Sequence, residues 1–372
     1  MNSTPFSSID EALDDLRAGK MIFVVDDEDR ENEGDLVALA EGITPETVNF
    51  MATHARGLIC VPLIDQRCDE LGLHAMVDRN TDPHGTAFTV SVDLEGEGVT
   101  TGISAHDRAK TINALTRPDT KAEQFRRPGH IFPLRARPGG VLRRAGHTEA
   151  AIDLARLAGS RPAGVIVEIM NEDGSMARLP DLEVMAARHG LRIISIEQLI
   201  RYRMERDRLV HELRAYRLDS PMGPWQVRVY GQTTSEQRHA SFSFGTWHED
   251  DEVLVRMQSG PFAASPWSHF DQSGSPDSAH FAAAMHQIAE RGAGCIVCLN
   301  QRGPATDWTE WDPSLPPSPT RSMGHDPLDY GVGAQILHGL GLRKVALLTQ
   351  NPMRRVGIEG YGLHIVQNVA LY

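Results

Sequence analysis

An acidic run directly behind an apolar one constrains this chain more than any other feature. Residues 26–35, DDEDRENEGD, hold seven carboxylates and one arginine, and they follow the apolar stretch 21–25, MIFVV. Five consecutive apolar residues predict a buried strand, so the acidic run begins at a strand end. Neighbouring carboxylates repel one another and raise each other's pKa values. The run is therefore either a solvated acidic loop or a site for Mg²⁺ or Mn²⁺, which prefer oxygen ligands.

Basic residues gather in a different segment. Residues 1–100 carry 6 Lys and Arg against 21 Asp and Glu, whereas residues 101–200 carry 15 against 11. Between Gln124 and Thr148 there are six arginines and four glycines and no acidic residue. Guanidinium groups pair bidentately with phosphate, and glycine lets backbone N–H groups approach an anion. This segment is either a phosphate site or a basic surface.

Composition excludes several classes of protein. The net charge of −13 argues against general nucleic-acid binding, which needs clustered Lys and Arg. No run of 18 apolar residues predicts a membrane span, and the acidic start MNSTPFSSIDEALDD does not resemble a secretion signal. Four cysteines in 372 residues are too few for a disulfide framework. We expect a cytoplasmic protein that binds neither membrane nor nucleic acid.

The length of 372 residues predicts two domains. Strands and helices intermix without a strict alternation, which favours a mixed-sheet α+β fold over a doubly wound one. We expect a first domain at 1–203, a linker at 204–220 that continues a closing helix, and a second α+β domain at 221–372. The expected elements are helices at 8–19, 148–157, 180–189 and 334–340 and one that starts at 44–45, strands at 21–25, 36–40, 58–63, 164–169, 193–196, 227–230, 253–255 and 345–348, and a long loop at 307–326.

Single residues in the first half are candidates for chemistry. His130 and His147 lie in the basic segment, where each is a core residue, a surface residue or a group that ligates metal or moves a proton. Glu168 interrupts the apolar strand 164–169, so its carboxylate either ends in solvent or is held for a function. Cys60 lies in another apolar strand, where a small buried side chain is the default.

Four motifs in order resemble 3,4-dihydroxy-2-butanone 4-phosphate synthase of riboflavin biosynthesis. They are DDEDRENEGDL at 26–36, TTGISAHDR at 100–108, RPGHIFPL at 127–134 and RAGHTEA at 144–150. The resemblance covers about the first 200 residues. It implies an α+β homodimeric enzyme, a lyase, that converts the small molecule D-ribulose 5-phosphate into 3,4-dihydroxy-2-butanone 4-phosphate and formate with two Mg²⁺ or Mn²⁺ ions per site.

The same resemblance implies roles for particular residues. The family's metal ligands fall on Glu31 and His147, and its two positions essential for catalysis fall on His130 and Glu168. The residues implied to contact substrate are Arg30, Glu31, Asp35, Arg144, Ala145, Gly146, His147, Thr148 and Glu168. The resemblance leaves open which residue performs each proton transfer and whether one subunit supplies the whole site.

The end of the chain resembles GTP cyclohydrolase II, through DYGVGAQIL at 329–337, LLTQNP at 347–352 and EGYGL at 359–363. That family binds zinc through three clustered cysteines, whereas residues 253–275 contain none. Leu328 stands where the family has an arginine that is its proposed nucleophile. Cys295 and Cys298 have zinc-like spacing, but their apolar neighbours favour two buried thiols on a strand. We therefore expect a degenerate domain without zinc or GTP cyclohydrolase activity, with a structural or regulatory role.

Two alternatives stay open for the second half. In the first, the chain is a bifunctional enzyme that also hydrolyses GTP. In the second, the second domain is a nucleotide-binding or dimerisation module.

Overall fold

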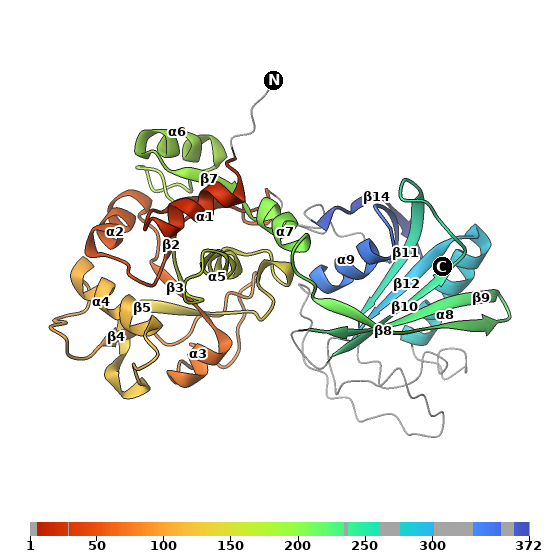
Figure 1. The fold of residues 1–372 in the computed structure, drawn as a ribbon, viewed down its shortest axis with the longest axis horizontal. Coiled ribbons are helices and arrows are strands. Elements are labelled where there is room, and N and C mark those ends of the chain that lie inside the picture. The colour runs from red at the N-terminus through yellow and green to blue at the C-terminus, as the bar shows by residue number, and fades with distance from the viewer. Residues whose placement is uncertain are drawn as a thin grey trace. The chain divides into compact units, whose positions relative to one another are not determined.

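The computed structural model describes residues 6–28, 30–233, 237–259, 276–300, 330–350 and 361–371. Its contacts divide the chain into two compact units, Met1–Tyr202 and Arg203–Tyr372. Each unit is built on a seven-stranded sheet (Figure 1). Within the described residues, no helix combines the length and the apolar character needed to cross a bilayer.

The first sheet has the strand order β4-β5-β3-β6-β2-β1-β7. β1 pairs with β7 and β3 with β5 in parallel, whereas the other pairs are antiparallel. Its strands are β1 (Ile22–Val25), β2 (Gly34–Leu39), β3 (Cys60–Ile64), β4 (Val92–Leu94), β5 (Phe125–Ala136), β6 (Gly164–Glu168) and β7 (Arg192–Ser195). The predicted mixed sheet is confirmed.

Local signals set the helix boundaries in this unit. The Ser8 side chain accepts from the N–H of Glu11 while the Glu11 carboxylate accepts from Ser8, so α1 begins with the expected capping box. At the start of α2, the Thr44 side chain accepts from the N–H of Thr47 and Pro45 is the first helical residue. The helices are α1 (Ile9–Arg17), α2 (Pro45–Phe50), the π-helix η1 (Met51–Ala55), α3 (Asp65–Glu70), α4 (Ala105–Thr116), the 3-10 turns η2 (Ala122–Gln124) and η3 (Gly140–Leu142), α5 (His147–Leu157), α6 (Leu179–His189) and α7 (Ile196–Met204).

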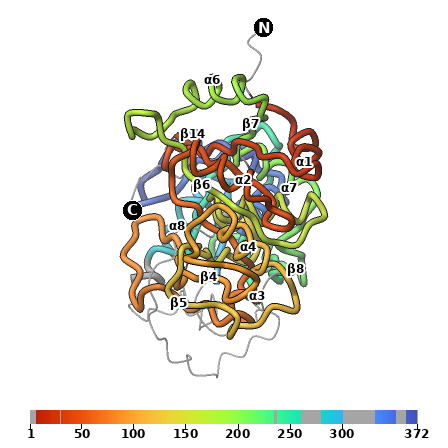
Figure 2. Tube along the Cα trace, turned by 90° about the vertical axis from the view of Figure 1, so that its left-hand side faces the viewer, coloured from red at the N-terminus to blue at the C-terminus, as the bar shows by residue number. Residues whose placement is uncertain are grey.

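Helices cover both faces of the first sheet. One face carries Leu36, Val61 and Val165, which belong to a core shared with α2, η1, α4 and α6. α5 packs on β2, β3, β5 and β6, and Gly164 of β6 has no space for a side chain because a Cβ would lie 2.7 Å from the Cβ of Ala151. α6 packs on β1 and β7, and Figure 2 shows it at the top beside β7. Alternate residues of β2 and β6 therefore face α5.

The second sheet has the order β14-β13-β11-β12-β10-β9-β8. β11, β12, β13 and β14 pair in parallel and the rest antiparallel, so this unit is also mixed. Its core holds Trp225, Phe242 and Phe281. Its elements are β8 (Val210–Ser220), β9 (Gly223–Gln232), β10 (Arg238–Phe244), β11 (Glu252–Ser259), α8 (Pro276–Arg291), β12 (Gly294–Leu299), α9 (Tyr330–Gly339), β13 (Lys344–Thr349) and β14 (His364–Ala370).

The structure differs from one expectation about the chain path. The segment 204–220 contains β8, an edge strand paired with β9 over ten positions, so most of the expected linker belongs to the second sheet. Its charged residues read as a helical pattern because an edge strand exposes most of its side chains to water. The expected loop at 307–326 lies outside the described residues.

The two thiols of the second unit are buried on β12, as predicted. Cys295 and Cys298 are three residues apart in a strand, so their side chains leave opposite faces of the sheet. Burial raises the pKa of Cys295 to about 12 and also raises the pKa of Cys298. These two thiols cannot form one metal site or one disulfide.

Candidate active site

Two carboxylates meet at adjacent strand ends in the first unit. Asp35 of β2 is the register partner of Glu168 of β6. Both have the parity of Gly164, the position where β6 approaches α5 most closely, so both point to the α5 side of the sheet. Asp35 is 3% exposed and Glu168 is half-buried. The sheet register therefore places the acidic run and Glu168 in one site.

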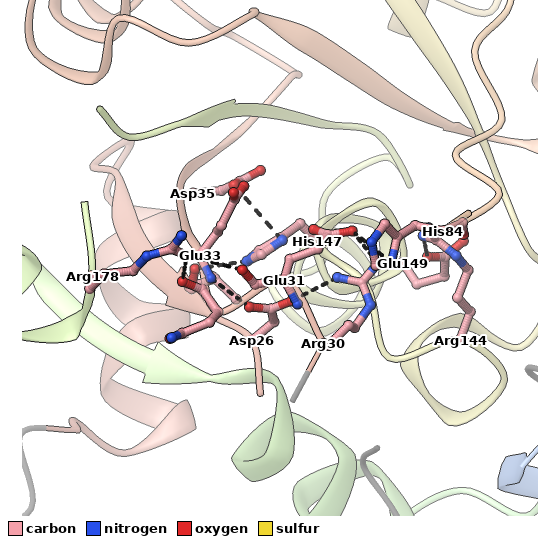
Figure 3. A network of polar contacts seen from close by, with 12 residues as sticks. Asp26, Arg30, Glu31, Glu33, Asp35, His84, Arg144, His147, Glu149 and Arg178 are labelled. Atoms are coloured by element: carbon pink, nitrogen blue, oxygen red, sulfur yellow. Dashed lines mark hydrogen bonds and ion pairs between the residues drawn. The ribbon is translucent and has the colours of Figure 1, made fainter. Parts of the chain in front are cut away.

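The acidic loop between β1 and β2 folds around one of its own carboxylates. Asp26 accepts from the N–H of Glu33 at 2.8 Å through Oδ1, and from the N–H of Glu31 at 3.2 Å and Arg30 Nη1 at 2.8 Å through Oδ2. Asn32 adopts a φ of 54°, in the left-handed region that closes the turn. These contacts direct the carboxylate of Glu31 toward the start of α5 (Figure 3).

His147 is the first residue of α5 and is buried against the loop. Its Nε2 lies 3.1 Å from the carbonyl oxygen of Val24, which can only accept, so Nε2 carries the proton and donates. The unprotonated Nδ1 lies 3.8 Å from Oδ1 of Asp35. Burial lowers the pKa of His147, which favours the neutral imidazole that metals bind. Ligand atoms of Asp26, Glu31 and His147 lie within 4.8 Å of one another.

The electrostatics of the site favour a bound cation. Burial raises the pKa of Asp35 well above its ordinary value, and the neighbouring Glu168 and Glu31 raise it further. Burial and Glu31 also raise the pKa of Glu33, which Arg178 lowers in part. Carboxylate oxygens with one imidazole nitrogen suit Mg²⁺ or Mn²⁺. The donor set therefore fits the divalent metal expected from the sequence, with Asp26 added to Glu31 and His147.

Arg144 lies on the other side of the loop in a buried ion pair (Figure 3). Its Nη1 donates to Oε2 of Glu149 at 2.8 Å, and its Nη2 donates to the carbonyl oxygen of His84 at 3.0 Å. A Cβ on Gly146 would lie 2.5 Å from Arg144 Nη1, so a side chain there would force this guanidinium to shift. His84 also faces Glu31, with Nδ1 3.7 Å from Oε1. Arg144 thus borders the predicted metal site.

Glu168 is fixed by the chain that precedes β3. Its Oε2 accepts from the N–H of Leu58 at 2.9 Å, and its backbone oxygen accepts from Gly57 at 3.2 Å. Cys60 follows in β3 and is buried; burial, Glu168 and Asp35 all raise the pKa of its thiol. Cys60 therefore lines the site as a neutral thiol.

His130 is not brought to the acidic loop by any contact among the described residues. It lies in β5, where its N–H donates to Oδ1 of Asp93 at 2.9 Å and its Nδ1 lies 2.7 Å from Oδ2. Asp93 thus orients the ring. Of the predicted site residues, the structure gathers Arg30, Glu31, Asp35, Arg144, Ala145, Gly146, His147, Thr148 and Glu168 around the α5 N-terminus.

The arginine-rich segment is divided between two parts of the first unit. Its first half is β5 and the residues next to it, and their arginines serve the fold. Arg127 donates to the carbonyl oxygens of Leu71, Ala122 and Phe125. Arg135 pairs with Asp65 and Asp69. Only the second half, near Arg144, reaches the acidic loop. Side chains of a strand point alternately to its two faces and are spaced by about 3.3 Å per residue, so the arginines of β5 cannot converge on one point.

Sequence reasoning missed several contributors to the site. They are Asp26 as a ligand, Glu33, His84, Glu149 and Arg178. Asp26 and Glu33 were visible as members of the acidic run, but periodicity does not say which carboxylates turn inward. His84 and Arg178 come from distant segments, and no local signal predicts such contacts.

Comparisons with known proteins agree with this site. The family model of 3,4-dihydroxy-2-butanone 4-phosphate synthase matches residues 10–202, and that of GTP cyclohydrolase II matches residues 211–370. The riboflavin biosynthesis protein RibBA of Aquifex aeolicus (strain VF5) is 45% identical over 98% of this chain and 92% of its own length. RibBA of Bacillus cereus (strain ATCC 14579) is 44% identical over 98% of this chain and 94% of its own.

Solved structures resemble the whole chain and the first unit. RibBX of A. baumannii, described as a two-domain 3,4-dihydroxy-2-butanone 4-phosphate synthase, matches 98% of this chain and 99% of its own with a TM-score of 0.67 and 38% identity. A 3,4-dihydroxy-2-butanone 4-phosphate synthase in complex with two magnesium ions matches 54% of this chain and 98% of its own, with a TM-score of 0.52 and 45% identity.

These matches confirm the predicted fold class and the prediction of an enzyme of the lyase class that acts in riboflavin biosynthesis. Both predicted family resemblances are confirmed at the level of the domains. The chain belongs to the 3,4-dihydroxy-2-butanone 4-phosphate synthase family and carries a second domain of the GTP cyclohydrolase II family.

Proposed function

We propose that the first unit converts D-ribulose 5-phosphate into 3,4-dihydroxy-2-butanone 4-phosphate and formate in a reaction that needs Mg²⁺ or Mn²⁺, two ions per site. The observation that carries the proposal is the gathering of Asp26, Glu31 and His147 within 4.8 Å at the start of α5. The atoms balance without a co-reactant, since one five-carbon sugar phosphate gives one four-carbon ketone phosphate and one formic acid.

Glu31 and His147 would hold the metal, with Asp26 beside them. A divalent metal bound there supplies Lewis-acid polarisation of a substrate carbonyl or hydroxyl. His147 would bind the metal through its Nδ1, because its Nε2 donates to the carbonyl oxygen of Val24. Arg30 places a positive charge 2.9 Å from Oε1 of Glu31. This charge offsets part of the negative charge of the acidic loop when the substrate binds.

The substrate phosphate would bind at the N-terminus of α5. Residues 147–149 open this helix, and their N–H groups have no acceptor in a preceding turn. Gly146 keeps the approach free of a side chain, and Arg144 adds a guanidinium at the same point. Arg144 to Thr148 therefore supply an anion site next to the metal ligands, as their proposed role in substrate binding requires.

Glu168 and His130 are the proposed catalytic residues. Glu168 faces the same side of the sheet as Asp35, so its carboxylate can remove or return a proton on substrate held between β2 and α5. His130 is oriented by Asp93, which is its side-chain partner among the described residues. We therefore include the homodimer in the proposal, since a second subunit can bring His130 to the site.

Formate release from D-ribulose 5-phosphate, measured with and without EDTA, tests the synthase activity. We expect formate that EDTA abolishes and that added Mg²⁺ or Mn²⁺ restores. A protein that binds the substrate saturably but releases no formate is a binding protein, and the proposal is then wrong.

For the second unit we propose that it does not hydrolyse GTP and that it binds no zinc, so that its role is structural or regulatory. Opening a purine ring needs a metal-activated water, and tetrahedral zinc needs three or four protein ligands. Residues 253–275 contain no cysteine, and Leu328 stands in the place of the family's arginine. The buried thiols Cys295 and Cys298 leave opposite faces of β12 and cannot replace the missing set.

The alternative is a bifunctional enzyme, and the match of residues 211–370 to the GTP cyclohydrolase II family favours it. Elemental analysis of the purified chain and GTP-dependent formate release decide between the two. We expect about zero zinc per chain, since a site with fewer than three ligands does not retain the ion. Stoichiometric zinc together with formate from GTP establishes the bifunctional enzyme.

A further inference from the structure

A second arginine contacts the acidic loop from the side opposite Arg144. Figure 3 shows Arg178 and Arg144 at opposite ends of the network. Arg178 Nη1 donates to the carbonyl oxygen of Glu31 at 3.0 Å and also to that of Asn32. We propose that Arg178 is a positioning residue, which holds the turn at residues 31–32 so that the carboxylate of Glu31 faces His147. This inference rests on the proposed metal site.

The turn needs an anchor on each side. On the inner side, Asp26 accepts the N–H groups of Glu31 and Glu33. On the outer side, the carbonyl oxygens of Glu31 and Asn32 accept from Arg178. Asn32 has a φ of 54°, a conformation in which a residue with a side chain is strained. Without the outer anchor, repulsion among the carboxylates would favour a more open loop.

Arg178 is itself fixed by the structure that follows β6. Its backbone N–H donates to Oδ2 of Asp181 at 3.0 Å, at the start of α6. The chain between β6 and α6 doubles back, so that Ala177 donates to the carbonyl of Ile169 at 2.9 Å. Ile169 in turn donates to the carbonyl of Gly34 at 3.1 Å. The same segment therefore holds the loop at Arg178 and at its far end, and it leads directly from Glu168.

Charge and position predict opposite effects for the removal of this arginine. Arg178 is a positive charge close to the proposed cation site, with Nη1 3.0 Å from the carbonyl oxygen of Glu31. If charge alone mattered, a neutral residue would let the site bind a cation more tightly. If Arg178 positions the loop, a neutral residue weakens cation binding, because Glu31 loses its fixed direction. The sign of the change thus separates the two roles.

The test is the affinity of the metal-free full-length protein for Mn²⁺, measured by electron paramagnetic resonance of the free ion without substrate. We compare the wild type with Arg178→Met, which keeps the length of the stem but removes the donors. We expect the affinity to fall by about tenfold or more, the equivalent of a hydrogen bond to a charged group. Arg188→Ala, an exposed arginine on the same helix, is the control and should match the wild type.

Activity gives a second readout. Arg178→Met should need more Mn²⁺ for half-maximal formate release but recover most of the wild-type kcat at saturating Mn²⁺. Circular dichroism and the metal-free thermal midpoint check that the variant folds. Should it not fold, Arg178→Leu removes the same charge and the same donors with a shorter side chain and is read in the same way.

The outcomes are distinct. A wild type that binds no Mn²⁺ overturns the proposed function itself. A wild type that binds Mn²⁺ while the folded variant binds it equally or more tightly overturns the positioning role alone. A kcat that saturating Mn²⁺ does not restore assigns Arg178 to the chemical step and also overturns the positioning role.

Discussion

Gly57→Ala should disable Glu168 without touching the metal ligands. A Cβ at Gly57 would lie 2.3 Å from the backbone oxygen and 2.7 Å from Oε2 of Glu168, and real Cβ atoms do not come so close. The chain before β3 must therefore shift away from the end of β6, which costs about 1–3 kcal/mol. The shift also weakens the bond from Gly57 to the Glu168 backbone and the bond from Leu58 to its carboxylate, worth about 1 and about 1.5–3 kcal/mol.

We expect a loss of about 3 kcal/mol in the free energy of unfolding of the first unit, allowing for partial relaxation. At about 2–4 °C per kcal/mol, its thermal midpoint falls by about 6–12 °C. At a temperature where the variant is folded, kcat for formate release should fall at least about tenfold, as expected for a displaced general base. Affinity for Mn²⁺ should change little, because Glu31 and His147 do not contact Gly57.

The matched control is Gly339→Ala, whose Cβ meets no atom within 4 Å. We expect the control to change stability by no more than about 1 kcal/mol. If Gly57→Ala keeps its thermal midpoint within about 2 °C and its full kcat, the contacts of Gly57 and Leu58 do not hold Glu168 in its catalytic position.

Three further results are expected. Glu31→Gln should weaken Mn²⁺ binding because it removes a ligand charge, whereas Glu168→Gln should bind Mn²⁺ and substrate but release no formate; equal loss of binding in both variants contradicts this division of roles. Asp107 accepts from the N–H and hydroxyl of Thr100 and from the N–H of Gly102, and the Thr100 hydroxyl is the main reason its pKa is lowered. Its contribution to stability is therefore present above the unfolded-state pKa of about 3.9 and is lost as the pH falls through the lower folded-state value. Asp107→Asn should lower the thermal midpoint at pH 7 by several degrees and flatten its decline between about pH 4 and pH 2; an unchanged acid limb in thermal scans contradicts this. Truncation of the chain after residue 208 should leave formate release from ribulose 5-phosphate per site intact if the second unit is only regulatory, whereas activity that becomes dependent on protein concentration indicates a role in dimerisation.

Local signals predicted much of the fold. The capping box at Ser8, the proline at 45 and the apolar runs at 21–25 and 164–169 gave elements within one or two residues of those observed. The edge strand β8 was missed because its exposed side chains carry no alternation of apolar and polar residues. β5 was missed because its arginines and glycines resemble an anion-binding loop, although they pair with carbonyl and carboxylate groups of neighbouring segments.

The candidate site was predictable only in part, for a similar reason. Glu31 and His147 were found through a resemblance of motifs, and their distance depends on where α5 crosses the sheet. No periodicity shows that Arg178 lies 3.0 Å from the carbonyl of Glu31, because that contact joins residues 147 positions apart. Contacts of this length depend on strand order, which the sequence pattern left open.

The register between β2 and β6 is the feature that joins the metal site to the acid–base site. Asp35 lies opposite Glu168, and Val37 opposite Ile166. Side chains alternate along a strand, so a slip of one residue would turn Glu168 into the apolar core and bring Val167 to the site. Val165 and Val167 of β6 lie in the core on the face away from α5, and that core has no place for the carboxylate of Glu168, so the register is fixed. The hydrophobic core thus sets the position of Glu168 relative to the acidic loop, and core substitutions in β6 should affect kcat before they affect metal affinity.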